Sequence, residues 1–278
     1  MEIGLSLLFA DEHPLADCLP KVASAGFRQV ELSDFRHPLS RWWEDPLAMK
    51  RALADAGLAA RTVHSPGAGW NNDAPDDATR LASIDAASSV FDAAREAGVE
   101  IAIVHPNTPD THTFLAEEFE ANFARAVDSL GVLAERAKDA GLRLAVENLP
   151  MRHLPRPGGR IEDTLRMIDG LGDHVGVCFD VGHSNANVDD PVAEIRAAGE
   201  KILCVHIQDN DGLGQDQHLI PGEGTVDWPA VIEALVTYAP DCTPNFEIGL
   251  KDYLTGTERD VDDLLATLAA LRNQWVGK

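Results

Sequence analysis

Apolar runs of six to eight residues alternate with amphipathic stretches along the whole chain. Helical patterns such as 77–98 and 117–141 carry apolar residues at intervals of three and four. Several helical patterns end in a glycine, which can take the left-handed conformation that closes a helix: Gly26, Gly57, Gly98 and Gly141. The runs suited to buried strands are 2–8, 27–32, 58–64, 99–105, 142–148, 174–180, 201–208 and 244–249.

Eight strands and eight helices in strict alternation over 278 residues predict an α/β fold, a (β/α)8 TIM barrel. No linker or break in composition interrupts residues 1–278, so we expect a single domain. A doubly wound open sheet is the alternative, but it usually carries a glycine-rich phosphate turn after the first strand, and LFADEHP lacks one. A helical-repeat fold is disfavoured by the β-branched runs.

Composition narrows the class of protein. The chain is 45% hydrophobic and 25% charged, which is typical of a soluble globular protein, and its formal net charge is −23. That charge disfavours a general surface for nucleic acid. No apolar stretch reaches the roughly 18 residues of a membrane span. The beginning of the chain also lacks the basic flank of a signal peptide.

The cysteines are those of a protein from a reducing environment. Cys18, Cys178, Cys204 and Cys242 are scattered without CxxC spacing, and two of them lie inside strand-like runs. We therefore expect reduced, buried thiols in a cytoplasmic protein.

The predicted strands end in side chains that bind metals. Strands three to eight end in His64, His105, Glu147, Asp180, His206 and Glu247, with gaps of 41, 42, 33, 26 and 41 residues. A barrel gathers the C-terminal ends of its strands at one rim, where active sites form. Clustered carboxylates repel one another unless a cation neutralises them. The pattern therefore predicts a divalent metal site, which His183, Asp216 and His218 in the following loops can join.

Five motifs in this order resemble the xylose-isomerase-like TIM-barrel superfamily: ENLP (147–150), FDVGH (179–183), HIQDND (206–211), DQHLIPGEGTVDW (216–228) and FEIG (246–249). The superfamily holds sugar isomerases, ketose 3-epimerases, inosose-processing enzymes and nucleases of the endonuclease IV type. Resemblance to the epimerases implies one metal held by Glu147, Asp180, His206 and Glu247. Resemblance to the nucleases implies three zinc ions on a larger set, which adds His64, His105, His183, Asp216 and His218.

The loops favour a small carbohydrate over DNA. The loop after the third strand, SPGAGWNNDAPDD, is acidic, whereas a DNA-binding surface needs Lys and Arg for phosphates. Trp70 in this loop suits the apolar face of a sugar, or packs in the core. The basic loop 151–160 carries Arg152, Arg156 and Arg160, of which Arg152 is our candidate for binding an anionic substrate group.

These observations predict a metal-dependent isomerase or epimerase that acts on a sugar, a keto-sugar or a sugar phosphate. It would move a proton through a metal-stabilised enediolate, with Glu147 and Glu247 as acid and base. His64, His105, His183, Asp216 and His218 would bind substrate or a second ion. Carboxylate-rich ligands favour Mn²⁺, with Zn²⁺, Co²⁺ and Mg²⁺ as alternatives.

Two other activities stay open at this point: a lyase or dehydratase acting on a keto-sugar or inosose, and an endonuclease IV-like phosphodiesterase. The expected partner is a small carbohydrate, with neither nucleic acid nor membrane. Many relatives in the superfamily form dimers or tetramers, so a homo-oligomer is compatible with the resemblance.

Overall fold

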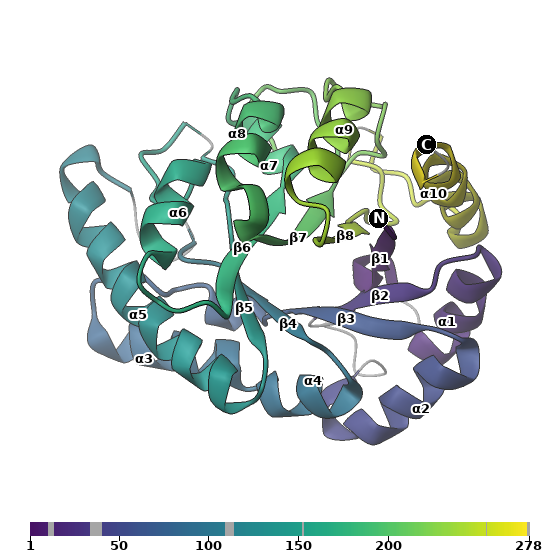
Figure 1. Cartoon of the computed structure of the whole chain (residues 1–278), viewed down its shortest axis with the longest axis horizontal. Helices are drawn as coiled ribbons and strands as arrows, with labels where there is room; N and C mark the ends of the chain where they lie inside the picture. The colour runs from purple at the N-terminus through teal and green to yellow at the C-terminus, as the bar shows by residue number, and fades with distance from the viewer. Residues whose placement is uncertain (11–13, 34–40, 109–113, 152, 254, 277–278) are drawn as a thin grey trace.

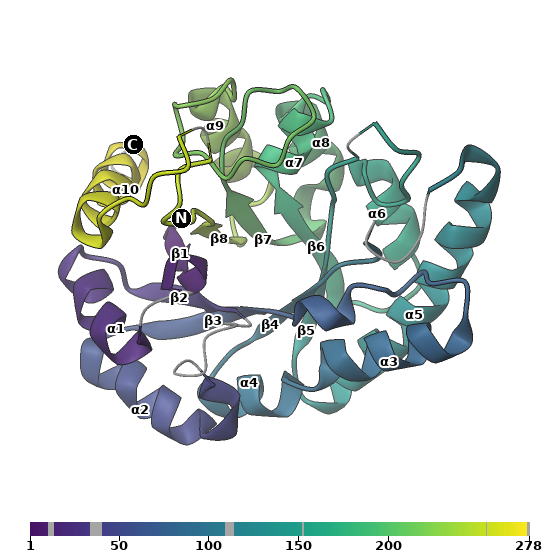
Figure 2. The same cartoon turned by 180° about the vertical axis from the view of Figure 1, so that it is seen from behind.

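Eight parallel strands form a closed barrel in which each strand pairs with its neighbour in the sequence and β1 pairs with β8. The computed structural model describes residues 1–10, 14–33, 41–108, 114–151, 153–253 and 255–276. Figures 1 and 2 show the barrel from opposite sides, with the helices in a ring around it. The strands are β1 Gly4–Ser6, β2 Gln29–Leu32, β3 Ala59–His64, β4 Ile101–Val104, β5 Arg143–Glu147, β6 Val175–Asp180, β7 Ile202–Ile207 and β8 Thr243–Phe246. The predicted TIM barrel is confirmed.

The described part of the chain contains more helices than the eight that the sequence predicts. They are α1 Leu15–Ser24, α2 Pro46–Ala56, α3 Asp77–Ser88, α4 Phe91–Ala97, α5 Phe119–Asp139, α6 Ile161–Ile168, α7 Val181–Ala186, α8 Pro191–Ala198, α9 Trp228–Tyr238 and α10 Val261–Val276. The stretch 77–98, predicted as one helix, is divided into α3 and α4. At the division the backbone N–H of Ser89 donates to the carbonyl of Ala86, three residues back, and the hydroxyls of Ser88 and Ser89 donate to the carbonyls of Ile84 and Ala86.

Local signals set where the helices begin and end. Asp side chains accept backbone N–H groups at the first turns of α2, α3, α8 and α9, where such groups have no partner within the helix. The glycines predicted to close helices, Gly26, Gly57, Gly98 and Gly141, all have positive φ. Every helix in the described residues is too short or too polar to cross a lipid bilayer.

The apolar side chains form two separate clusters. The larger one lies between the barrel and the helices and includes Ala102 and Val104 of β4. The smaller one includes the alternate residues Ile101 and Ile103 of the same strand. Because successive side chains of a strand point to opposite faces, the smaller cluster is the interior of the barrel. All four cysteines are buried and free, as expected.

Candidate active site

The pleat of the strands explains why polar side chains gather above the barrel interior. The small inner cluster contains Ile103, Ala145, Cys178 and Cys204 on four adjacent strands. Two residues further along each strand, the same face presents a histidine or a carboxylate. These side chains are, in the same order, His105, Glu147, Asp180 and His206. The interior is therefore apolar below and polar at the C-terminal rim.

Four of the predicted residues meet at one point. The ligand atoms of Glu147, Asp180, His206 and Glu247 lie within 4.8 Å of one another. Nδ1 of His206 is 3.2 Å from an oxygen of Glu147, 3.2 Å from one of Glu247 and 3.8 Å from one of Asp180. All four side chains are almost completely buried. Three carboxylates around one imidazole nitrogen are a donor set that fits a divalent cation, which would offset their repulsion.

The histidines predicted at the ends of the third and fourth strands both contact the other oxygen of Glu147. Nε2 of His64 lies 3.2 Å and Nε2 of His105 lies 3.1 Å from Glu147 Oε2. The ring of Trp70 stacks on His105, with centroids 4.3 Å apart and planes 20° apart. Nδ1 of His64 faces the carbonyl of Ser65 at 3.0 Å, so this nitrogen carries a hydrogen and Nε2 faces the carboxylate. A cation, or a second proton on the ring, is needed to make that contact favourable.

Asp216 has a similar pair of histidines. Its two oxygens lie 3.3 Å from Nε2 of His183 and 3.3 Å from Nε2 of His218. In each ring Nδ1 faces a backbone carbonyl at 2.8 Å, that of Asn148 for His183 and that of Glu247 for His218. Both Nε2 atoms are therefore directed at the same carboxylate. His218 has a φ of 46°, a left-handed conformation that is uncommon outside glycine.

Burial and mutual charge shift the pKa values of this cluster strongly. Burial by itself lowers the pKa of His206, but the surrounding carboxylates, Glu247 foremost, raise it well above its ordinary value. Burial raises the pKa of Asp180 to about 7, and Glu147 adds to this shift while His183 opposes it. These groups hold protons near neutral pH that a cation would displace.

The two histidines on Glu147 have opposite shifts. Burial lowers the pKa of His105 to about 4. Burial acts on His64 in the same direction, but its contact with Glu147 outweighs this and raises the pKa to about 9. For Glu147 burial acts upward, yet His206 and His105 hold its pKa well below the ordinary value. One carboxylate oxygen therefore supports one charged imidazole of the pair.

Three residues of the site were missed by the sequence reasoning. Glu31 of β2 is completely buried beside Nε2 of His206. Gln208 donates through Nε2 to Asp180 and to Asp216, which links the two carboxylate groups. Asn148 forms a pair of hydrogen bonds with the backbone of Asp180. For Gln208 the available signal was its position two residues after His206, on the same face of the strand. For Asn148 the signal was its position directly after Glu147.

The FDVGH motif contains a glycine for a steric reason. A Cβ at Gly182 would overlap the side-chain amide of Gln208. Asp180 accepts from the backbone N–H of His183 and so begins α7 directly after β6. The motif thus positions an acid and an imidazole on a strand–helix junction while Gln208 lies against it.

Asp209 in HIQDND is a structural residue, as its contacts show. It accepts hydrogen bonds from the backbone N–H groups of Asn210, Gly222 and Val226 and from Nε1 of Trp228. These bonds fold the PGEG loop back onto β7. The loop continues from Asp216 and His218, so Asp209 supports two site residues. None of its described hydrogen bonds reaches the metal-competent cluster, which is Glu147, Asp180, His206 and Glu247.

In the described part of the basic loop 151–160, both arginines have polar or charged partners. Arg156 is buried and donates to Asn107 and to the carbonyl of Pro150. Arg160 is exposed and lies 3.8 Å from Glu162. Arg152, the candidate for an anionic substrate group, lies outside the described residues.

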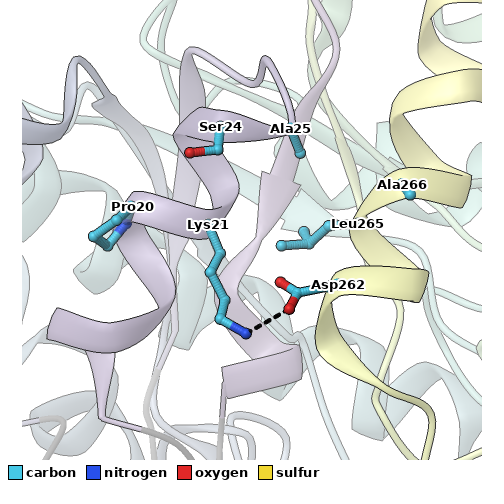
Figure 3. A pocket seen from close by; sticks show the side chains of 7 residues that line it. All are labelled: Pro20, Lys21, Ser24, Ala25, Asp262, Leu265 and Ala266. Atoms are coloured by element: carbon cyan, nitrogen blue, oxygen red, sulfur yellow. Dashed lines mark hydrogen bonds and ion pairs between the residues drawn. The ribbon is translucent and has the colours of Figure 1, made fainter.

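A hollow between α1 and α10 is separate from this site (Figure 3). Lys21 and Asp262 form an ion pair of 2.9 Å across it, and their side chains are 44% and 67% exposed. None of the residues that line the hollow belongs to the candidate active site. An exposed ion pair of this kind contributes little to stability.

The chain belongs to the xylose isomerase-like TIM barrel family, which it matches over residues 19–242. It is 27% identical over 243 residues to the uncharacterized protein MJ1311 of Methanocaldococcus jannaschii, covering 84% of this chain and 79% of that protein. The structure of an L-ribulose 3-epimerase has a TM-score of 0.83 at 20% identity, covering 100% of this chain and 95% of that one. The structure of the IOLI protein with a bound zinc atom has a TM-score of 0.80 at 17% identity, covering 99% of each chain. The structural likeness establishes a shared fold.

Proposed function

We propose that the protein is a divalent-metal-dependent isomerase or epimerase of a sugar or keto-sugar. The observation that carries the proposal is the convergence of Glu147 and Glu247 on one nitrogen of His206, each at 3.2 Å, with Asp180 beside them. Two carboxylates held at one point by strands on different sides of the barrel suit proton removal and return at a single carbon. The shared fold with L-ribulose 3-epimerase supports this reading.

Glu147, Asp180, His206 and Glu247 would hold the metal. Their donors are mainly carboxylate oxygens, which favours one Mn²⁺, with Co²⁺, Mg²⁺ or Zn²⁺ as substitutes. When bound, the ion would act as a Lewis acid that stabilises negative charge developing on the substrate oxygens. The zinc atom in the structure of the IOLI protein supports a metal in this fold.

The side chains have separate tasks in this proposal. Glu147 and Glu247 take a proton from the substrate carbon and return it. His183, whose ring is fixed by its bond to the Asn148 carbonyl, binds a substrate hydroxyl. Trp70 lies parallel to His105 and offers its apolar face to the sugar ring. The buried position of the carboxylates excludes water, which strengthens the electrostatic interactions.

The remaining polar groups, namely His64, His105, Asp216 and His218, would bind further hydroxyls or a weaker second ion. Asp216 between two imidazoles also favours a second candidate, a metal-dependent phosphodiesterase. The net charge of −23 disfavours that reading, because a nucleic acid would be repelled. A lyase or dehydratase on a keto-sugar uses the same proton removal. It differs because a group then leaves the substrate, whereas an isomerase or epimerase returns a proton.

The test is a screen for proton exchange. The Mn²⁺-loaded protein is incubated in deuterated water with ketoses, keto-sugars and their phosphates, and NMR follows solvent deuterium entering a carbon-bound position. We expect incorporation and formation of the isomer or epimer with one substrate group. Glu147→Gln is the matched variant, which should lose the exchange. Cleavage of an abasic-site oligonucleotide without any exchange would overturn the proposal.

A further inference from the structure

Glu31 is a buried carboxylate on the inward face of β2, outside the group formed by Glu147, Asp180, His206 and Glu247. It is the third residue of β2, completely buried, and its neighbours in register are Ser6 on β1 and Thr62 on β3. An ionised carboxylate without contact to water is costly unless other groups compensate its charge. A carboxylate buried in this position therefore needs a specific partner for its charge.

The partners of Glu31 are few. Its Oε2 accepts from the hydroxyl of Thr62 at 2.8 Å and, at 3.5 Å, from the amide of Asn245. Both of its oxygens lie 3.3 Å from Nε2 of His206. Oε1 has no hydrogen-bond partner among the described residues, so the hydrogen bond of Nε2 goes to Oε2. Among the hydrogen bonds and ion pairs described for this carboxylate, His206 is the one ionisable partner, and His64 adds a smaller electrostatic attraction.

The two nitrogens of His206 face different groups. Nδ1 faces Glu147 and Glu247, whereas Nε2 faces Glu31. A nitrogen that binds a metal must be free of hydrogen, so the hydrogen of a neutral ring is then on the other nitrogen. Glu31 lies where it can accept that hydrogen. Because the two nitrogens are on different sides of the ring, Glu31 does not join the cluster of Nδ1.

We propose that Glu31 is the positioning residue of His206, accepting the hydrogen of Nε2 and so holding the ring with Nδ1 free to bind the metal. This inference rests on the proposed function, because it assumes a metal among Glu147, Asp180, His206 and Glu247. A carboxylate behind a metal-binding histidine fixes the tautomer and the orientation of the ring and raises its basicity. Glu31 would thus act through His206, without touching the substrate.

The test variant is Glu31→Gln, which keeps the size of the side chain. Thr62 and Asn245 continue to need an acceptor, so the glutamine oxygen would face them and its NH₂ group would face Nε2. That arrangement favours a hydrogen on Nδ1, the nitrogen that the metal needs. We expect the affinity for Mn²⁺, measured by calorimetric titration, to fall about 10- to 100-fold.

Glu194→Gln is the matched control. Glu194 is also buried, and it accepts from the backbone N–H of Ile161 and the hydroxyl of Ser184, without a contact to His206. The same loss of a buried charge is made there away from the metal-competent cluster. Its affinity for Mn²⁺ should equal that of the unmodified protein. An equal loss in both variants would mean that charge or stability alone is responsible, and would overturn the proposal.

A second measurement reads the tautomer directly and does not depend on the variant folding. In the Zn²⁺-loaded unmodified protein, nitrogen-15 NMR of labelled histidine should show a hydrogen on Nε2 of His206 and none on Nδ1. A hydrogen on Nδ1, or a Glu31→Gln variant with unchanged affinity, would refute the role of Glu31. If the unmodified protein binds neither ion, the proposed function fails first and the inference fails with it.

Discussion

Replacing Asp209 by asparagine should destabilise the protein without removing the metal site. Oδ1 of Asp209 accepts from the N–H groups of Asn210 and Val226, and Oδ2 accepts from Gly222 and from Nε1 of Trp228. An asparagine has one oxygen and one NH₂ group in these places. Whichever way the amide is turned, two N–H donors face another donor.

The size of the effect follows from that count. Each buried donor left without an acceptor costs about 1–3 kcal/mol, so Asp209→Asn should lower the free energy of unfolding by roughly 2–6 kcal/mol. The melting temperature should fall by at least about 4 °C. Urea unfolding followed by circular dichroism measures the change. Asp241→Asn, at an exposed position, is the control and should change stability by less than about 0.5 kcal/mol.

Two results would contradict the role of Asp209 as an acceptor that holds the loop. A loss below about 1 kcal/mol would mean that the loop rearranges to satisfy its donors, contrary to the geometry described above. Loss of Mn²⁺ binding in a variant that still folds would make Asp209 part of the metal site.

Three further predictions concern the backbone, packing and pH. Val188 is 76% exposed with a φ of 64°, so Val188→Asn should raise the stability by about 1 kcal/mol in urea unfolding, and a decrease would contradict the strain. Gly182→Ala should lower the free energy of unfolding by about 1–3 kcal/mol, because the new methyl overlaps Gln208. Gly131→Ala inside α5 is the control, where only ordinary contacts are near, and it should be neutral or stabilising. Equal effects of the two substitutions would refute this. Burial lowers the pKa of His206 but the carboxylates around it raise it well above the ordinary value, so a metal must displace its proton. The affinity for Mn²⁺ should therefore rise with pH, about tenfold per unit for each proton released, and titrations between about pH 6 and 8 that show no rise would be inconsistent with His206 as a ligand.

The fold could be predicted from the sequence because the patterns that specify its strands and helices are local. A barrel strand needs a short apolar run, and a helix around it needs apolar residues every three or four positions, so periodicity alone located all eight strands. The division of 77–98 into two helices was not readable. It lies at Ser88 and Ser89, whose hydroxyls bond to nearby carbonyls, and serines also form such bonds inside continuous helices.

Part of the site could be predicted from the sequence for a related reason. His64, His105, Glu147 and Asp180 end apolar runs or follow them directly, so topology predicts that they meet. Glu31 is different, because FRQVEL is also compatible with an exposed glutamate on a strand edge. Only the closed barrel, in which β2 has its inward face covered, shows that this carboxylate is buried beside His206.

The bonds of the loops were beyond sequence reasoning as well. Asp209 stands next to the predicted ligands in a motif rich in acids, and nothing in its residue type separates a ligand from a loop anchor. The type of residue at Arg156 does not show whether it binds an anion or supports the loop, and the structure has it buried and donating to the carbonyls of Pro150 and Asn107. Such roles depend on where a loop returns to the barrel, which residue patterns do not encode locally.

The position of a bound metal would show directly whether these side chains form the proposed site. Crystals of the protein loaded with Mn²⁺ would be measured at a wavelength where manganese scatters anomalously. We expect one dominant peak bound by Glu147, Asp180, Nδ1 of His206 and Glu247, with Glu31 on the other side of the ring. A dominant peak elsewhere, no peak at this point, or three equally occupied positions that include His64 and His218 would contradict it.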